Sequence, residues 1–397
     1  MFFIKRNNIG LLMSFFLAII IFSSNTLQLT NAIWPTEDWN TNNPFRQQMK
    51  SKPLNDMVDF IENFNDNYAF SDIDSVVVIK NGFIIKEWYS YFWEVDDIHV
   101  QWSVTKSFTC TLIGIAIKEG FISSVNELVL DFFSDRTILN VDYRKEAITI
   151  EHLLLMSTGL AYPGDDEIWL GWMNAEDQVQ YILDLPMATE PGTIFNYDTG
   201  GSHLLSAIIQ KTTSMSTEDF AVQYLFNPLG ISHYHWLYDN QGISFGGHGL
   251  HLTSRDMAKL GYLYLNNGYW EENQILPNYW VEFVTQINWY LSGTFSYASH
   301  WWIHPYLNMF SAQGRYGQSI FVLPDEDIIV VFTADLSDAD PYPYLTIIEN
   351  FVLPSIMNNK IILYLEILIP IGLCFTVVFK TLIIRKRKQS RMIKKKF

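Results

Sequence analysis

Cysteine is scarce in this sequence, because only Cys110 and Cys374 occur among its 397 residues. Cys110 lies within an expected helix and Cys374 within an apolar C-terminal segment, so we expect no structural disulfide. The sequence also lacks internal repeats, low-complexity stretches, a Gly-rich phosphate loop and a dinucleotide-binding fingerprint. These absences exclude a disulfide scaffold, a repeat protein and the common nucleotide-binding motifs. The high apolar content, 49% of the chain, instead predicts a substantial folded core.

Positive charge is also scarce over most of the chain. Between residues 33 and 359 there are 14 Lys and Arg residues against 41 Asp and Glu residues. An acidic surface is unsuited to the phosphate backbone, so we expect no nucleic-acid partner.

The two ends of the chain have the pattern of membrane targeting. Residues 1–32 begin with Lys5 and Arg6, continue as an apolar run and end in small and polar residues, which is typical of a signal peptide or an uncleaved signal anchor. Residues 361–384 are mostly apolar and long enough to form a transmembrane helix. The basic tail at 385–397 follows directly and indicates a cytoplasmic end. We therefore expect a single-pass protein of the cell membrane that contacts the lipid bilayer through its C-terminal helix, with residues 33–358 as an extracytoplasmic domain.

The pattern of elements predicts a mixed fold of helices and strands, of the α/β (α+β) class. Two β-rich runs flank the hairpin signal Asn81-Gly82, and more strands are expected near the C-terminus. Helical patterns fill the middle, whereas residues 33–56 show no element. The expected strands are 75–79, 83–91, 299–304, 309–312, 318–323 and 328–334; the expected helices are 103–119, 148–154, 176–185, 199–211, 217–226, 254–266 and 343–357. We expect one antiparallel sheet built from N- and C-terminal strands, flanked by helices and carrying a mainly helical insertion.

The strongest chemical signal is Ser103-Val104-Thr105-Lys106 at the start of an expected helix. Residues three apart share a helix face, so Lys106 can reach the Ser103 hydroxyl. The helix N-terminus favours negative charge, which suits an activated serine nucleophile. No other lysine of the chain has a serine three residues before it. A solvent-exposed helix start is the alternative interpretation.

Two later segments offer partners for this serine. Tyr197 follows a Gly-containing loop, and beside a buried lysine cation its pKa would fall enough for the phenolate to accept the serine proton. The run from Met309 to Gly314 could place a strand against the helix and offer a backbone N–H, which with the N–H of Ser103 would form an oxyanion hole. A core tyrosine and a plain hairpin are the alternatives.

Together these segments resemble the serine β-lactamase and penicillin-binding-protein superfamily, especially its class-C-like branch, which includes esterases and 6-aminohexanoate-dimer hydrolases. The resemblance covers roughly residues 70–355. It rests on the order of the stretches 101–107, 148–160, 197–199, 246–261 and 317–324.

The resemblance implies roles for individual residues. Ser103 would be the acylated nucleophile, Lys106 would take part in proton transfer, and Tyr197 would be the general base and acid. Thr199, Gln313 and Gly314 would contact the substrate. Thr199 stands where the family has Asn, and Ala312-Gln313-Gly314 lacks the cation of Lys-Thr-Gly, so efficient penicillin hydrolysis is not expected.

Other candidate sites are less consistent with their surroundings. Gly242-Ile243-Ser244-Phe245-Gly246 matches a nucleophile elbow, but no buried strand precedes it and no helix follows it. His248 and His251, like His233 and His235, are closely spaced without a matching carboxylate pattern, so we expect no metal and no cofactor. The substrate pocket is expected to include some of Trp169, Trp172, Trp236 and Trp301.

The sequence thus predicts a membrane-anchored serine hydrolase acting on a small-molecule or peptide-like ester or amide through an acyl-serine intermediate. The alternative is a non-catalytic binding or cell-surface protein that kept the fold, and the departures at Thr199 and 312–314 favour it.

Overall fold

The computed structural model describes residues 34–67, 72–162, 166–292, 295–337 and 343–357. The expected signal segment (1–32), transmembrane helix (361–384) and basic tail (385–397) lie outside these ranges. Within them, no helix has both the length and the apolar character that crossing a bilayer requires.

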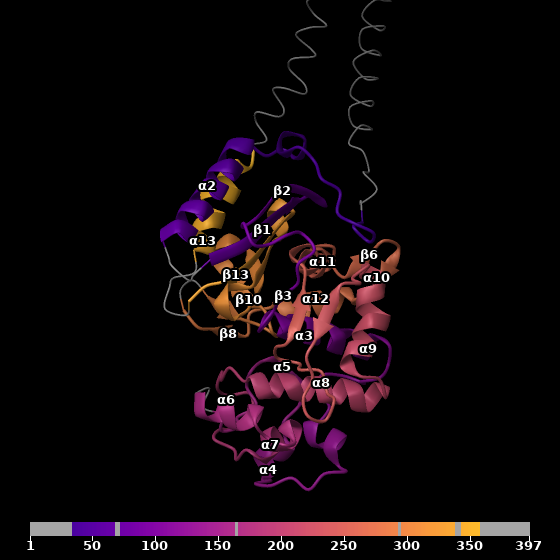
Figure 1. The fold of residues 1–397 in the computed structure, drawn as a ribbon. Coiled ribbons are helices and arrows are strands. Elements are labelled where there is room, and N and C mark those ends of the chain that lie inside the picture. Colours follow the sequence, from indigo (N-terminus) through magenta and orange to yellow (C-terminus); the bar gives the residue numbers. More distant parts are fainter. Residues whose placement is uncertain (1–33, 68–71, 163–165, 293–294, 338–342, 358–397) are drawn as a thin grey trace, which may run out of the picture.

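An antiparallel sheet of eight strands lies at the centre of the described structure (Figure 1). Its order is β2-β1-β13-β12-β11-β10-β9-β8. The strands are β1 (Asp72–Lys80), β2 (Phe83–Tyr89), β8 (Trp289–Tyr290), β9 (Ser296–Tyr297), β10 (Trp302–His304), β11 (Met309–Gln313), β12 (Ser319–Leu323) and β13 (Ile328–Asp335). N-terminal β1 pairs with C-terminal β13, with Val77 opposite Val331, which confirms the sheet predicted from both ends of the domain. Asn81 and Gly82 have φ values of 52° and 76°, as a tight hairpin turn requires.

Helices and two small sheets complete the fold. The small sheets contain β3 (His99–Val100), β4 (Tyr234–Trp236) and β5 (Leu250–Leu252), and β6 (Tyr269–Trp270) and β7 (Asn273–Gln274). The α-helices are α2 (Ser51–Asn67), α3 (Val104–Lys118), α4 (Tyr143–Glu146), α5 (Ile150–Leu154), α6 (Asp166–Met173), α7 (Gln178–Asp184), α8 (Thr199–Thr213), α9 (Thr217–Ala221), α10 (Asn227–Leu229), α11 (Ser254–Leu265), α12 (Asn278–Thr285), α13 (Tyr344–Ile347) and α14 (Leu353–Ser355). Helices α4 to α8 lie together at one end of the molecule, which matches the predicted helical insertion (Figure 1).

The sheet separates two apolar cores. Along β13, Val330 and Phe332 face the core that α2 and α13 cover, whereas Ile329 and Val331 face the core that contains α3 and α11. Successive strand residues point to opposite faces, so a strand covered on both sides is apolar throughout.

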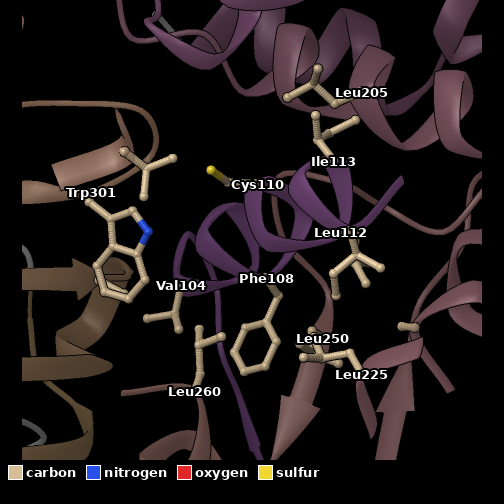
Figure 2. Packing of buried hydrophobic residues seen from close by; sticks show 14 of the residues in the cluster. Val104, Phe108, Cys110, Leu112, Ile113, Leu205, Leu225, Leu250, Leu260 and Trp301 are labelled. Atoms are coloured by element: carbon tan, nitrogen blue, oxygen red, sulfur yellow. The ribbon is translucent and has the colours of Figure 1, made fainter. Parts of the chain in front are cut away.

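Helix α3 is the central helix of the larger core. All residues from Val104 to Ala116 are buried. Figure 2 shows α3 side chains such as Phe108 and Ile113 surrounded by residues of other elements, among them Leu205, Leu260 and Trp301. Because the helix is buried on every side, its polar side chains also need partners: Thr109 Oγ1 donates to Gly246 O and Thr111 Oγ1 hydrogen-bonds Tyr264.

Helix α2 (Ser51–Asn67) is not among the helices expected from the sequence. Its residues Leu54, Met57, Val58, Ile61 and Phe64 are buried, and they recur every three or four positions. This periodicity is the signature of an amphipathic helix and was present in the sequence.

Two expected helices differ from the structure at proline. The helix expected to stop before Asn227-Pro228 continues as the π-helical turn η3 (Val222–Phe226) and then α10. The last helix likewise passes through η7 (Ile348–Val352) before Pro354 in α14. A wider turn directly before each proline allows the chain to remain helical although proline cannot donate the usual bond.

Candidate active site

Ser103 sits at the first turn of α3, after a strained residue. Trp102 has a φ of 46°, a left-handed conformation that is unusual for a bulky side chain. Ser103 occupies the N-cap position, but its hydroxyl makes no capping hydrogen bond. The hydroxyl is therefore available for chemistry at the positive end of a 15-residue helix.

Lys106 lies one helical turn further on and contacts this hydroxyl. Its Nζ is 3.0 Å from Ser103 Oγ and donates to Gly247 O at 2.8 Å. The residue is only 1% exposed, and burial lowers the pKa of its amine to about 7, although the Asp198 carboxylate opposes this shift. Near neutral pH a large fraction of Lys106 is therefore an uncharged amine that can accept the serine proton.

Tyr197 completes the predicted group of three residues. Lys106 Nζ lies 4.8 Å from the centre of the Tyr197 ring. Burial raises the pKa of Tyr197 to about 12, and a hydrogen bond with Ser103 only partly offsets this. The expected fall in its pKa is thus not found, because desolvation disfavours the phenolate and also the lysine cation that would have stabilised it. Tyr197 is a phenol near neutral pH.

A Gly-rich segment holds the lysine between two helices. Gly246 O and Gly247 O accept hydrogen bonds from Thr109 Oγ1 and Lys106 Nζ, both at 2.8 Å. On the other side, a Cβ added to Gly247 would lie 2.6 Å from Thr199 Cγ2. Glycine is needed here because the segment passes closely between α3 and α8.

The three predicted substrate contacts lie in different surroundings. Thr199 is beside Gly247, and Gly314 lies against Ser103, since an added Cβ would be 3.2 Å from Ser103 N. The N–H of Gly314 already donates to Gln318 O at 2.8 Å. Gly314 therefore allows strand β11 to approach the nucleophile, and it is not itself the second oxyanion donor.

Gln313 points elsewhere. Its Nε2 donates to Ser311 Oγ at 2.8 Å and contacts His304 Nε2 at 3.4 Å. Alternation along β11 puts Gln313 on the same sheet face as Met309, which belongs to the core that α2 covers. The structure thus places Gly314 against the nucleophile and Thr199 beside the segment that holds Lys106, whereas the side chain of Gln313 lies on the other face of the sheet.

Two residues beside Lys106 received no role from the sequence. His300 Nδ1 donates to the backbone carbonyl of Lys106 at 3.0 Å, and its Nε2 lies 3.3 Å from Ser202 Oγ. Burial lowers the pKa of His300 to about 3, so the ring is neutral and links α3 to α8. Asp198, adjacent to Tyr197, is 2% exposed. The sequence does offer a signal for Asp198, because it stands between the candidate catalytic residue Tyr197 and the start of a predicted helix.

Aromatic side chains lie next to Ser103 and next to Tyr197. Trp102 packs edge-on against Tyr316 at 5.3 Å between ring centres. Trp302 stacks on Tyr197 and packs edge-on against Tyr297. Of the tryptophans expected to line the pocket, Trp172, Trp236 and Trp301 are fully buried in the core. The fourth, Trp169, is half-buried and packs against His248, next to Gly247, while Trp102 and Trp302 lie beside Ser103 and Tyr197.

The alternative sites of the sequence find little support. Ser244 is 2% exposed and lies in a loop, without the strand and helix that a nucleophile elbow requires. In the part of the chain that the structure describes, no group of three or more His, Cys, Asp or Glu residues is placed to hold a metal ion.

Comparisons with known proteins show which family this chain is similar to. The beta-lactamase family model matches residues 59–344. The chain is 23% identical over 291 residues to the 6-aminohexanoate-dimer hydrolase of Paenarthrobacter ureafaciens, which covers 67% of this chain and 74% of that protein.

Solved structures share the fold. An octameric penicillin-binding protein homologue from Pyrococcus abyssi has a TM-score of 0.62 and 21% identity, covering 77% of this chain and 78% of that one. EstCE1, a hydrolase with promiscuous acyltransferase activity, has a TM-score of 0.64 and 16% identity, and the match covers 76% of this chain and 98% of that one. The family match, which extends from α2 to α13 and contains Ser103, Lys106 and Tyr197, shows that this chain belongs to the beta-lactamase family of serine hydrolases.

Proposed function

We propose that this protein hydrolyses an ester or amide through an acyl-Ser103 intermediate. The observation that carries the proposal is the buried Lys106 amine, 3.0 Å from Ser103 Oγ, at the start of α3. As Ser103 Oγ bonds to the substrate carbonyl carbon, its proton passes to Lys106 Nζ. The carbonyl oxygen becomes an oxyanion, which the N–H of Ser103 and the helix N-terminus would stabilise.

Tyr197 then supplies the proton for the departing group. Its phenol holds that proton near neutral pH and hydrogen-bonds Ser103. Collapse of the tetrahedral intermediate breaks the bond to the alcohol or amine, which leaves with the Tyr197 proton. The proton on Lys106 returns to Tyr197. Water then attacks the acyl-serine by the same route, releasing a carboxylic acid and restoring Ser103.

The surroundings of Ser103 favour an apolar substrate. Two aromatic pairs, Trp102 with Tyr316 and Tyr197 with Trp302, lie next to the reacting group and would offer aromatic surface to the substrate. Strand β11 offers no lysine at the position where the β-lactam carboxylate would be bound, since Ala312 and Gln313 stand there. We therefore propose small esters or amides with uncharged acyl groups as substrates.

A fluorophosphonate probe and a series of p-nitrophenyl esters test this proposal on the full chain. The parent should be labelled and should hydrolyse esters, and Ser103→Ala should abolish both. Ser107→Ala is a matched control, because the Ser107 hydroxyl donates to His300 O at 2.7 Å and lies outside the reacting group. Labelling that persists in Ser103→Ala would refute the assignment, and a parent without labelling or turnover would favour a non-catalytic binding protein.

We also propose that the domain is tethered to the outer face of the cell membrane. The support is the apolar run 361–384 followed by the basic residues at 385–397. The full chain should remain with membranes after a carbonate wash, whereas residues 33–357 secreted behind a cleavable signal peptide should be released. Protease added to intact cells should cleave the domain. Protection of the domain in intact cells would contradict this orientation.

A further inference from the structure

Asp198 has a buried carboxylate next to Tyr197, and only one of its two oxygens accepts a hydrogen bond. Its side chain is 2% exposed and caps α8, since Oδ1 accepts a hydrogen bond from Gly201 N at 2.9 Å. Its Oδ2 is buried and accepts no hydrogen bond from the described residues. A cap requires only one oxygen, so the capping role does not account for the second one.

The carboxylate belongs to the buried cluster around Lys106. Its chain neighbour Tyr197 has its ring centre 4.8 Å from Lys106 Nζ, and helix α8, which begins directly after Asp198, packs against α3. Asp198 raises the pKa of the Lys106 amine against the larger lowering by burial, and Lys106 in turn opposes the rise that burial causes in the pKa of Asp198, to about 6. Two glycines give the carboxylate room, because an added Cβ on Gly201 would lie 2.9 Å from Oδ2 and one on Gly200 would lie 3.3 Å from Oδ1.

The other ionisable groups around Lys106 keep a constant charge between pH 5 and 9. His248, next to Gly247, and His300 both have a pKa lowered to about 3 by burial, so both rings are neutral. Tyr197 is a neutral phenol over the same range, since its pKa is about 12. Among the described groups that act on Lys106, Asp198 is thus the one that supplies a negative charge.

We propose that Asp198 is a positioning residue that stabilises the protonated form of Lys106 and thereby sets the lower pH limit at which Ser103 is activated. The role rests on the proposed acyl-serine chemistry. Without the carboxylate, the buried ammonium loses its counter-charge and releases its proton at lower pH. More of the lysine is then the uncharged base in mildly acidic solution.

The test is the pH dependence of fluorophosphonate labelling of the full chain, measured for the parent and for Asp198→Asn. The asparagine Oδ1 can still accept from Gly201 N, so the cap remains while the charge is lost. The parent labelling rate should rise with pH and reach half of its maximum near pH 7. In Asp198→Asn the half-maximum should move down by about one to three pH units, as expected for loss of an adjacent opposite charge.

Controls separate this role from capping. Asp177 caps α7 in the same way, with Gln180 N at 2.9 Å, so Asp177→Asn should leave the midpoint unchanged. If Asp198→Asn folds poorly, Asp198→Ser provides a second uncharged cap. An unchanged or higher midpoint in the folded variants would overturn the role. A parent that is never labelled would instead overturn the proposed hydrolase function and this role with it.

Discussion

At the scale of single residues, the site depends on removing charged groups from water. Lys106 has its pKa lowered to about 7 and Tyr197 has its pKa raised to about 12, in both cases mainly by burial. The two shifts assign the base to the lysine and the acid to the tyrosine. Ser103 needs no lowered pKa of its own, because an acceptor lies 3.0 Å away.

A substitution at Gly314 tests how closely strand β11 must approach Ser103. The Gly314 φ of −127° suits any residue, but a Cβ would overlap Gln101 O and lie 3.2 Å from Ser103 N. Gly314→Ala should therefore displace the Ser103 turn and reduce the fluorophosphonate labelling rate, by about 100-fold for a shift near 1 Å. Gly120→Ala is the control, because nothing lies within 4 Å of its added Cβ. It should cost about 1 kcal/mol of stability and retain labelling. Full labelling of Gly314→Ala would contradict the prediction.

At the scale of elements, helices carry the site and the sheet supports them. Helix α3 provides Ser103 and Lys106, the segment before α8 provides Tyr197, and β11 ends against the nucleophile. Helix α2 lies on the opposite face of the sheet, where its buried residues belong to the second core. Its buried stripe packs against β1 and β13 in the second core.

Substitutions in helix α2 should therefore change the stability of the protein without changing the chemistry at Ser103. Ile61 is fully buried, so Ile61→Ala should lower the free energy of unfolding by about 2–5 kcal/mol through the cavity it creates. The pH midpoint of labelling should not move. Asp59→Ala, on the exposed face of α2, should change stability by less than about 0.5 kcal/mol. Denaturant unfolding and the labelling profile measure both quantities, and a shifted midpoint in Ile61→Ala would count against the separation.

At the scale of the whole molecule, one sheet joins two cores. Both faces of β13 are buried, and the last described residues return to the first, since Met357 N donates to Gln48 O at 2.8 Å. If the strands of the sheet separate, both cores lose the buried side chains that the sheet contributes to them. The two halves should therefore unfold together.

Variants in the two cores test this cooperativity. Ile347→Ala in the smaller core and Leu204→Ala in the larger core remove buried side chains on opposite sides of the sheet. Each should lower a single unfolding midpoint, with tryptophan fluorescence and far-UV circular dichroism changing together. Two separate transitions in either variant would show that the cores unfold independently.

Much of the fold is encoded in local patterns. The Asn81-Gly82 turn, the paired strands around it, the Ser103–Lys106 spacing and the helix after Tyr197 all depend on residues within a few positions of one another. The apolar periodicity of helix α2 is equally local. The family relationship also follows from the sequence, because it rests on the order of several short motifs.

Contacts between distant segments were decided only by the tertiary structure. Lys106 meets Gly247 across 141 positions, and His300 bridges two helices that no local pattern connects to it. Gln313 turns away from the site because strand alternation places it on the other face of the sheet. The pKa directions of Lys106, Tyr197 and Asp198 depend on how much water packing removes around them, and the sequence alone does not specify that quantity.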